Sequence, residues 1–115
     1  MLKVLIVQEP HLSNILNGHK TWEIRRQNTN IRGLIGLGRN EEMYGKAILK
    51  DSFPMSVQDL MKHQNKHLVS PQWLKDYAKG KNILFVWLLE KVERLEKPIK
   101  IPRSYGNWVL YDNKS

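Results

Sequence analysis

The chain has 115 residues and contains no cysteine, so disulfide bonds and thiolate metal sites are excluded. Apolar residues make up 41% of it and charged residues 26%, a balance typical of an ordered domain rather than a disordered chain. This length suits one hydrophobic core, so we expect a single domain over residues 1–115 with a frayed tail at 112–115. The formal net charge of +8 favours polyanionic partners such as nucleic acid.

The pattern of apolar residues predicts no membrane association. No apolar run approaches the roughly 20 residues that a membrane-spanning helix needs. The run at residues 1–7 is too short for a secretory signal, and no cleavage site follows it. We therefore expect a cytoplasmic protein in which this run forms a buried strand.

The N-terminal part of the chain predicts a strand, a short helix and a second strand. The apolar run at 4–7 is typical of a strand buried on both faces. Pro10 suits the first turn of a helix that continues over residues 12–17, and Gly18 can end it in a left-handed conformation. Residues 20–25 then favour an extended chain, because Thr, Trp and Ile are common in strands.

Further strands and two helices are predicted in the rest of the chain. The helices begin at the capping residues Ser56 and Ser70, and the second ends at Gly80. The predicted strands are 33–38, 44–53, 82–89 with a continuation at 92–95, and 108–111. The glycines at 33, 36 and 38 indicate close backbone approach or a bulge rather than a phosphate loop.

A carboxylate between two cations marks the predicted strand at 20–25. Strand alternation places Glu23 and Arg25 on one face, and Lys20 at the entrance can curl toward them. Glu23 can then accept a proton while the cations neutralise a phosphate. The group can equally be an ordinary surface salt bridge. We expect exposed side chains, so removing Lys20 or Arg25 should change the stability by about 1 kcal/mol or less.

Other residues are candidates for binding or catalysis. His11 is a candidate general base, because its ordinary pKa lies near neutrality. Trp22 should point into the core, opposite to Glu23, whereas Tyr105 lies in a basic loop where it can stack on a base. The candidate binding residues are Arg25, Arg26, Arg32, Arg39, Arg103 and Tyr105.

His63 and His67 have the spacing of a metal pair on a helix. Gln64 stands where the metalloprotease motif needs Glu, and no carboxylate nearby completes a ligand set. We therefore expect neither a metal nor a cofactor.

The run at residues 18–25 reads Gly-x-Lys-x-x-Glu-x-Arg, and it follows a strand, a Pro-containing step and a short helix. It resembles the signature of the activating signal cointegrator homology (ASCH) domain, a member of the PUA-like superfamily. Strands beginning at Gly33 and Gly45 and a closing segment at 98–108 extend the resemblance. It implies an α+β fold, a PUA-like mixed β-barrel with two or three short helices. The family usually has Gln before the Pro and an aromatic residue after it, where this chain has Glu9 and His11.

Charge and resemblance together indicate binding of single-stranded RNA, or of a modified nucleoside or nucleotide, in a basic cleft at the signature strand. The alternative is a hydrolase at this cleft, with Lys20, Glu23 and His11 as catalytic residues of a metal-independent ribonuclease. An amidohydrolase of N4-acetylcytidine is a further alternative. Relatives of that class imply Thr at the position of Glu23 and a Glu in the central helical region, and residues 56–70 contain no Glu. A scaffold for an acidic protein fits the charge but leaves Glu23 unexplained.

Overall fold

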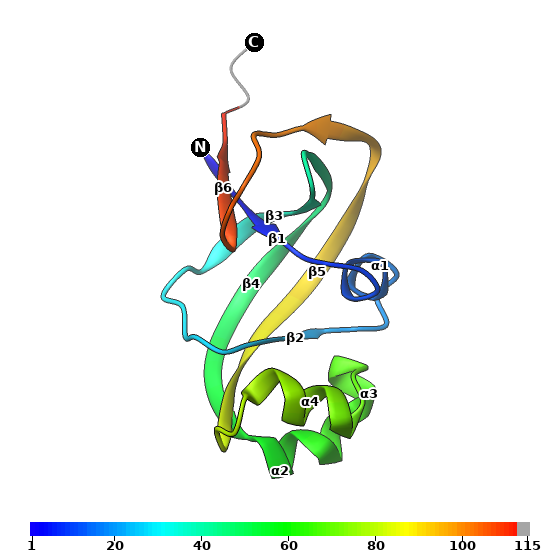
Figure 1. Cartoon of the computed structure of the whole chain (residues 1–115). Coiled ribbons are helices and arrows are strands. Elements are labelled where there is room, and N and C mark those ends of the chain that lie inside the picture. The colour runs from blue at the N-terminus through cyan, green and yellow to red at the C-terminus, as the bar shows by residue number, and fades with distance from the viewer. Residues whose placement is uncertain (113–115) are drawn as a thin grey trace.

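The computed structural model describes residues 1–112, and its six strands form one mixed sheet in the order β2-β5-β4-β3-β1-β6 (Figure 1). Strands β1 and β3 run parallel, and the other neighbouring pairs of the described sheet are antiparallel. The strands are β1 (Leu2–Ile6), β2 (Trp22–Arg25), β3 (Gly33–Arg39), β4 (Glu42–Ser56), β5 (Ile83–Lys100) and β6 (Trp108–Tyr111). The tail expected at 112–115 lies outside the described residues from 113 onward.

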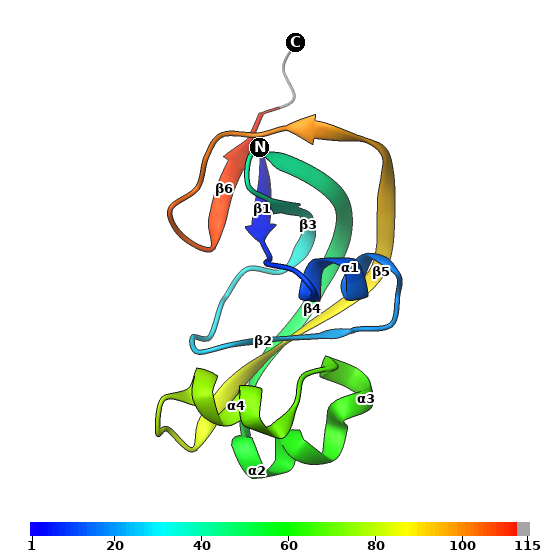
Figure 2. The ribbon, with the colours of Figure 1, turned by 45° about the vertical axis from the view of Figure 1, so that its right-hand side comes forward.

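The helical part consists of three short regions within the described residues, which confirms the α+β class. These are α1 (His11–Leu16), the unbroken series α2 (Val57–Leu60), η1 (Met61–His63) and α3 (Gln64–His67), and α4 (Pro71–Ala78). Figure 2 shows α2, α3 and α4 together on one side of β2, while α1 lies apart from them beside β5. None of the described helices is long and apolar enough to span a membrane.

Local sequence explains where the helices begin and end. The hydroxyl of Ser56 accepts a hydrogen bond from the Asp59 amide, and the hydroxyl of Ser70 accepts one from the Trp73 amide, so both serines are N-caps as predicted. Gly18 adopts a φ of +80° just after α1. A side chain there would be strained, which is why Gly ends this helix.

The sheet is not closed into the expected barrel. Strands β2 and β6 are its two edges and do not pair with each other. Register shifts along β4 and β5 bend the sheet and bring these edges toward one another. A side chain bridges the remaining gap: Arg25 on β2 donates to the Ile6 carbonyl oxygen of β1 at 3.0 Å and to Asn107 Oδ1, beside β6, at 3.0 Å.

Trp22 packs at the margin of the core, which supports its predicted interior position in part. Its half-buried ring packs edge-to-face on Phe53, with centroids 5.8 Å apart, in the cluster that joins α2–α4 to β2 and β5. A second cluster packs α1 against the sheet, through residues such as Leu12 and Ile15. At Gly38 an added Cβ would lie 2.7 Å from the Glu42 carbonyl oxygen, and the pairing of β3 with β4 shifts between Leu37 and Gly38. Close backbone approach and a bulge are therefore confirmed at Gly38.

Candidate functional site

A cleft of about 420 Å³ lies where the sheet fails to close. It is bordered by the edge strand β2, the end of β1, helix α4 and the loop before β6. The residues that line it are Ile6, Gln8, Glu9, His11, Glu23, Ile24, Arg25, Trp73, Tyr77, Gly106 and Asn107. Two signature residues, Glu23 and Arg25, therefore meet aromatic side chains of a helix some fifty positions later in the chain.

Arg25 and Glu23 form a mostly buried ion pair in this cleft. The side chain of Arg25 is 12% exposed and that of Glu23 is 6% exposed. Arg25 Nε and Nη2 donate to the same carboxylate oxygen, Glu23 Oε2, at 3.0 and 2.7 Å. With the bonds to Ile6 and Asn107, four of the five N–H groups of Arg25 have partners. Among residues 1–112, the second N–H on Nη1 has no hydrogen-bond partner.

Lys20 lies behind Glu23 rather than in the cleft. Its side chain is 1% exposed, and its Nζ donates to the His67 carbonyl oxygen and lies 3.7 Å from Glu23 Oε1. Burial lowers the pKa of Lys20, while the Glu23 carboxylate acts in the opposite direction. The expected position at an exposed cleft mouth is therefore wrong. The C-terminal end of α3 covers residue 20. It is held there by a hydrogen bond from the Thr21 amide to the Lys66 carbonyl oxygen.

Aromatic rings also line the cleft. Trp73 and Tyr77 of α4 are stacked, with centroids 4.5 Å apart and an interplanar angle of 18°. The ring of His11 meets Trp73 edge-on at 5.2 Å. Burial lowers the pKa of His11, and the nearby Lys20 and Arg25 lower it further. The imidazole is therefore neutral at neutral pH, and it can accept a proton.

The model of the ASCH domain family matches residues 5–110. The chain belongs to the ASCH domain family. Members of this family are associated with RNA binding. The crystal structure of ASCH from Zymomonas mobilis resembles the chain with a TM-score of 0.75 and 22% identity, over 85% of this chain and 72% of that chain. A tyrosine-to-phenylalanine variant gives the same TM-score, and a serine-to-alanine variant gives 0.73. This likeness shows the shared fold, and no curated protein matches the chain.

The basic residues expected to bind are distributed around the ASCH cleft rather than along it. Arg26 lies over the Tyr77 ring at 3.9 Å and donates to the Tyr77 carbonyl oxygen at 2.7 Å. Arg32 pairs with Asp51 at 3.5 Å, and neither Arg32 nor Arg39 lines the cleft. Arg25 is the one Lys or Arg among the lining residues, and two carboxylates accompany it. The cleft is therefore less basic than the sequence indicates.

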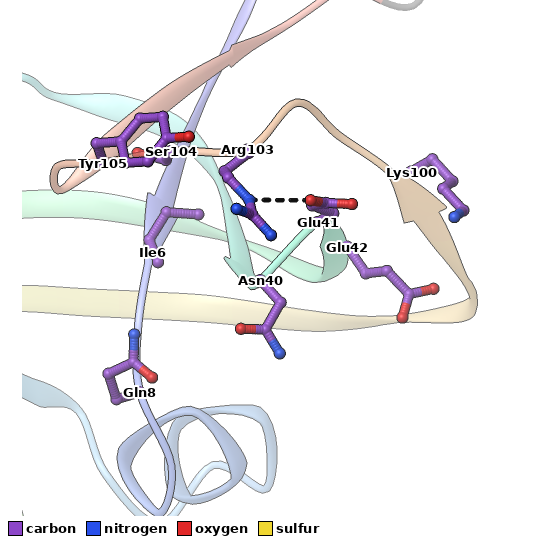
Figure 3. A pocket seen from close by; sticks show the side chains of 9 residues that line it. All are labelled: Ile6, Gln8, Asn40, Glu41, Glu42, Lys100, Arg103, Ser104 and Tyr105. Atoms are coloured by element: carbon purple, nitrogen blue, oxygen red, sulfur yellow. Dashed lines mark hydrogen bonds and ion pairs between the residues drawn. The ribbon is translucent and has the colours of Figure 1, made fainter.

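Arg103 and Tyr105 line a second hollow, of about 640 Å³, which adjoins the cleft (Figure 3). The two share Ile6 and Gln8 as lining residues. Figure 3 shows Arg103 facing Glu41, and the bond from Arg103 Nε to Glu41 Oε1 is 3.1 Å long. Of the predicted binding residues of this ASCH domain, Arg25 lines the cleft and Arg103 and Tyr105 line the hollow. Arg26, Arg32 and Arg39 line neither depression.

Sequence reasoning missed the aromatic side of the cleft. In α4, the spacing of Trp73, Leu74 and Tyr77 places all three on one side of the helix. Only Leu74 is fully buried, while the rings of Trp73 and Tyr77 are half-buried and line the cleft. Two aromatic residues four positions apart are the signal that could have found them. No local pattern marks Asn107, because its role depends on a loop that meets Arg25 only in the folded chain.

The histidine pair has a structural explanation in this ASCH domain. His67 is fully buried, its Nε2 lies 2.6 Å from the Leu60 carbonyl oxygen, and its Nδ1 accepts from the Val69 amide at 3.1 Å. The ring of His63 packs against Trp22. Both nitrogens of His67 are occupied, so it joins α2 to the chain after α3.

Acid should destabilise the fold through His67. Burial lowers its pKa below the ordinary 6.5, so below pH 6.5 the unfolded chain binds more protons than the folded one. The unfolding free energy should therefore fall as the pH is lowered through 6.5 toward the folded-state pKa. Denaturant unfolding at a series of pH values measures this slope. His67→Gln should reduce the slope, leaving the His11 contribution of the same sign.

Proposed function

We propose that this domain binds single-stranded RNA, or a modified nucleoside, in the cleft between β2 and α4. The observation that carries the proposal is the stacked Trp73–Tyr77 pair, which shares the cleft with the ion pair of Glu23 and Arg25. Unpaired bases bind proteins by stacking on aromatic rings and by hydrogen bonds along their polar edges. The cleft offers both kinds of contact, and the family association with RNA supports the same ligand.

The polar groups of the cleft fit a base or ribose better than a chain of phosphates. Glu23 and Glu9 can accept hydrogen bonds from amino or hydroxyl groups, and Arg25 has one free N–H to donate. Phosphates would instead contact the cations at the margins, such as Arg26. The overall charge of +8 favours the approach of such a ligand.

Titration with single-stranded RNA over a range of salt concentrations tests the proposal. The logarithm of the affinity should fall linearly with the logarithm of salt, with a slope near −0.7 for each phosphate contacted. Trp73→Ala should weaken binding at every salt concentration by about 1–3 kcal/mol, the scale of one lost base stack. Failure of the wild type to bind any RNA or nucleoside would refute the proposal. An RNA affinity that does not depend on salt would exclude contacts to phosphates, and the ligand would then be a nucleoside.

A second candidate function is cleavage of RNA, favoured by the presence of His11 and Glu23 in the same cleft. Either group could take the proton from a ribose 2′-hydroxyl while the 2′-oxygen forms a bond to phosphorus, the bond from phosphorus to the 5′-oxygen breaks, and a proton from water goes to that 5′-oxygen. Arg25 is the cation placed to stabilise the charge that develops on the phosphate. The amidohydrolase alternative lacks support here, because Lys20 does not line the cleft.

A further inference from the structure

The second hollow has the features of a binding site for a base, although none of its residues belongs to the ASCH signature. It is bordered by the turn between β3 and β4, the end of β5 and the loop at 103–105. Tyr105 is 93% exposed, so almost the whole ring is free to stack on a ligand. The Ser104 hydroxyl accepts a bond from the Gly106 amide at 3.2 Å and lies 3.0 Å from the Trp108 carbonyl oxygen. These contacts fix the loop that presents Tyr105.

The charges of this hollow exclude a simple phosphate site. Two cations, Lys100 and Arg103, face two carboxylates, Glu41 and Glu42, so the lining carries no net positive charge. The amides of Gln8 and Asn40 complete the polar lining. Carboxylates and amides match the amino and carbonyl groups on the edge of a nucleobase. Figure 3 shows Arg103 beside Glu41, with Tyr105 at one end of the group of lining side chains.

The two depressions are continuous along one short stretch of chain. Residues 103–105 line the hollow and residues 106–107 line the cleft, while Ile6 and Gln8 belong to both. Two bases joined by one phosphate can therefore occupy neighbouring sites, one against Trp73 and the other against Tyr105. A free nucleoside would use only one of them.

We infer that the hollow is a second base-binding subsite, and that the ligand of this domain is a single-stranded oligonucleotide of at least two nucleotides rather than a free nucleoside. This inference rests on the proposed function of the cleft. It assigns Trp73 to one base and Tyr105 to its neighbour.

Binding of adenosine monophosphate and of the dinucleotide ApA, measured by titration with NMR detection, tests the inference. ApA should bind more tightly than the monophosphate to the wild type. Tyr105→Ala should weaken ApA binding by about 5- to 150-fold, the scale of one lost base stack, and leave the affinity for the monophosphate unchanged. Tyr105→Phe keeps the ring and should bind ApA like the wild type. Trp73→Ala should weaken binding of both probes.

The other outcomes separate the inference from the function on which it rests. If ApA binds no more tightly than the monophosphate, or if Tyr105→Ala binds ApA normally while Trp73→Ala does not, the second subsite is refuted and the cleft stands. If neither probe binds, or if Trp73→Ala changes neither affinity, the proposed function fails together with the inference.

Discussion

Arg25→Ala is expected to lower the free energy of unfolding by about 3–5 kcal/mol, the usual cost of removing one partner from a buried ion pair. Glu23 would stay buried with Lys20 at 3.7 Å as its remaining cation. The Ile6 carbonyl and the Asn107 side chain would also lose their donor, so the side-chain link from β2 to the end of β1 and to the loop before β6 would be lost. Urea denaturation of the two proteins measures the difference.

Arg32→Ala is the matched control for this variant. Arg32 pairs with Asp51 at 3.5 Å, and the two side chains are 40% and 55% exposed. An exposed pair of this kind contributes about 0–1 kcal/mol. A loss at Arg25 no larger than that at Arg32 would contradict the buried network and restore the sequence-based expectation of a solvent-exposed site.

Glu23→Gln should reduce the rate of RNA cleavage by roughly 10²–10⁴-fold if the domain is a ribonuclease with Glu23 as its general base. The substitution also leaves Lys20 and Arg25 buried without their carboxylate, so it should destabilise the fold by a similar amount to Arg25→Ala. The assay therefore needs a temperature at which the variant is folded, verified by its NMR spectrum.

Lys20→Met separates loss of a catalytic group from loss of stability. This variant removes a buried cation behind Glu23 but changes no residue that lines the cleft. Its turnover should stay close to that of the wild type, although its stability falls. If Glu23→Gln and Lys20→Met lose turnover equally, the loss comes from reduced stability and Glu23 is not the general base. A wild type that cleaves no RNA would eliminate the ribonuclease alternative.

The features that the sequence predicted correctly are those that depend on neighbouring residues. Helix caps at Ser56 and Ser70, the left-handed Gly18 and the buried strand near residue 5 all depend on neighbours in sequence, and the structure confirms them. The long strand β5 was also partly predicted, although residues 82–89 and 92–95 belong to one continuous element. The bulges that bend it leave no clear trace in the sequence.

The features that could not be predicted depend on distant parts of the chain. A strand rich in Lys, Glu and Arg is normally exposed, and here the covering segment around His67 comes more than forty residues after Lys20. The sheet is open because its edge strands β2 and β6 do not pair. The alternation of apolar and polar residues along a strand does not show whether two distant strands will pair. The cleft depends on the relative position of α4 and β2, so the spacing of Trp73 and Tyr77 can indicate an aromatic pair but not the cleft that the pair lines.

The indole N–H signals of the four tryptophans offer the most direct test of the central claim, that a base binds against α4 in the cleft. In a ¹⁵N-labelled sample titrated with single-stranded RNA, the signal of Trp73 should shift strongly, because a stacked base changes the magnetic environment of the ring. The signal of Trp22, packed against Phe53 and His63, should move little. An unchanged Trp73 signal at saturating RNA would contradict the account.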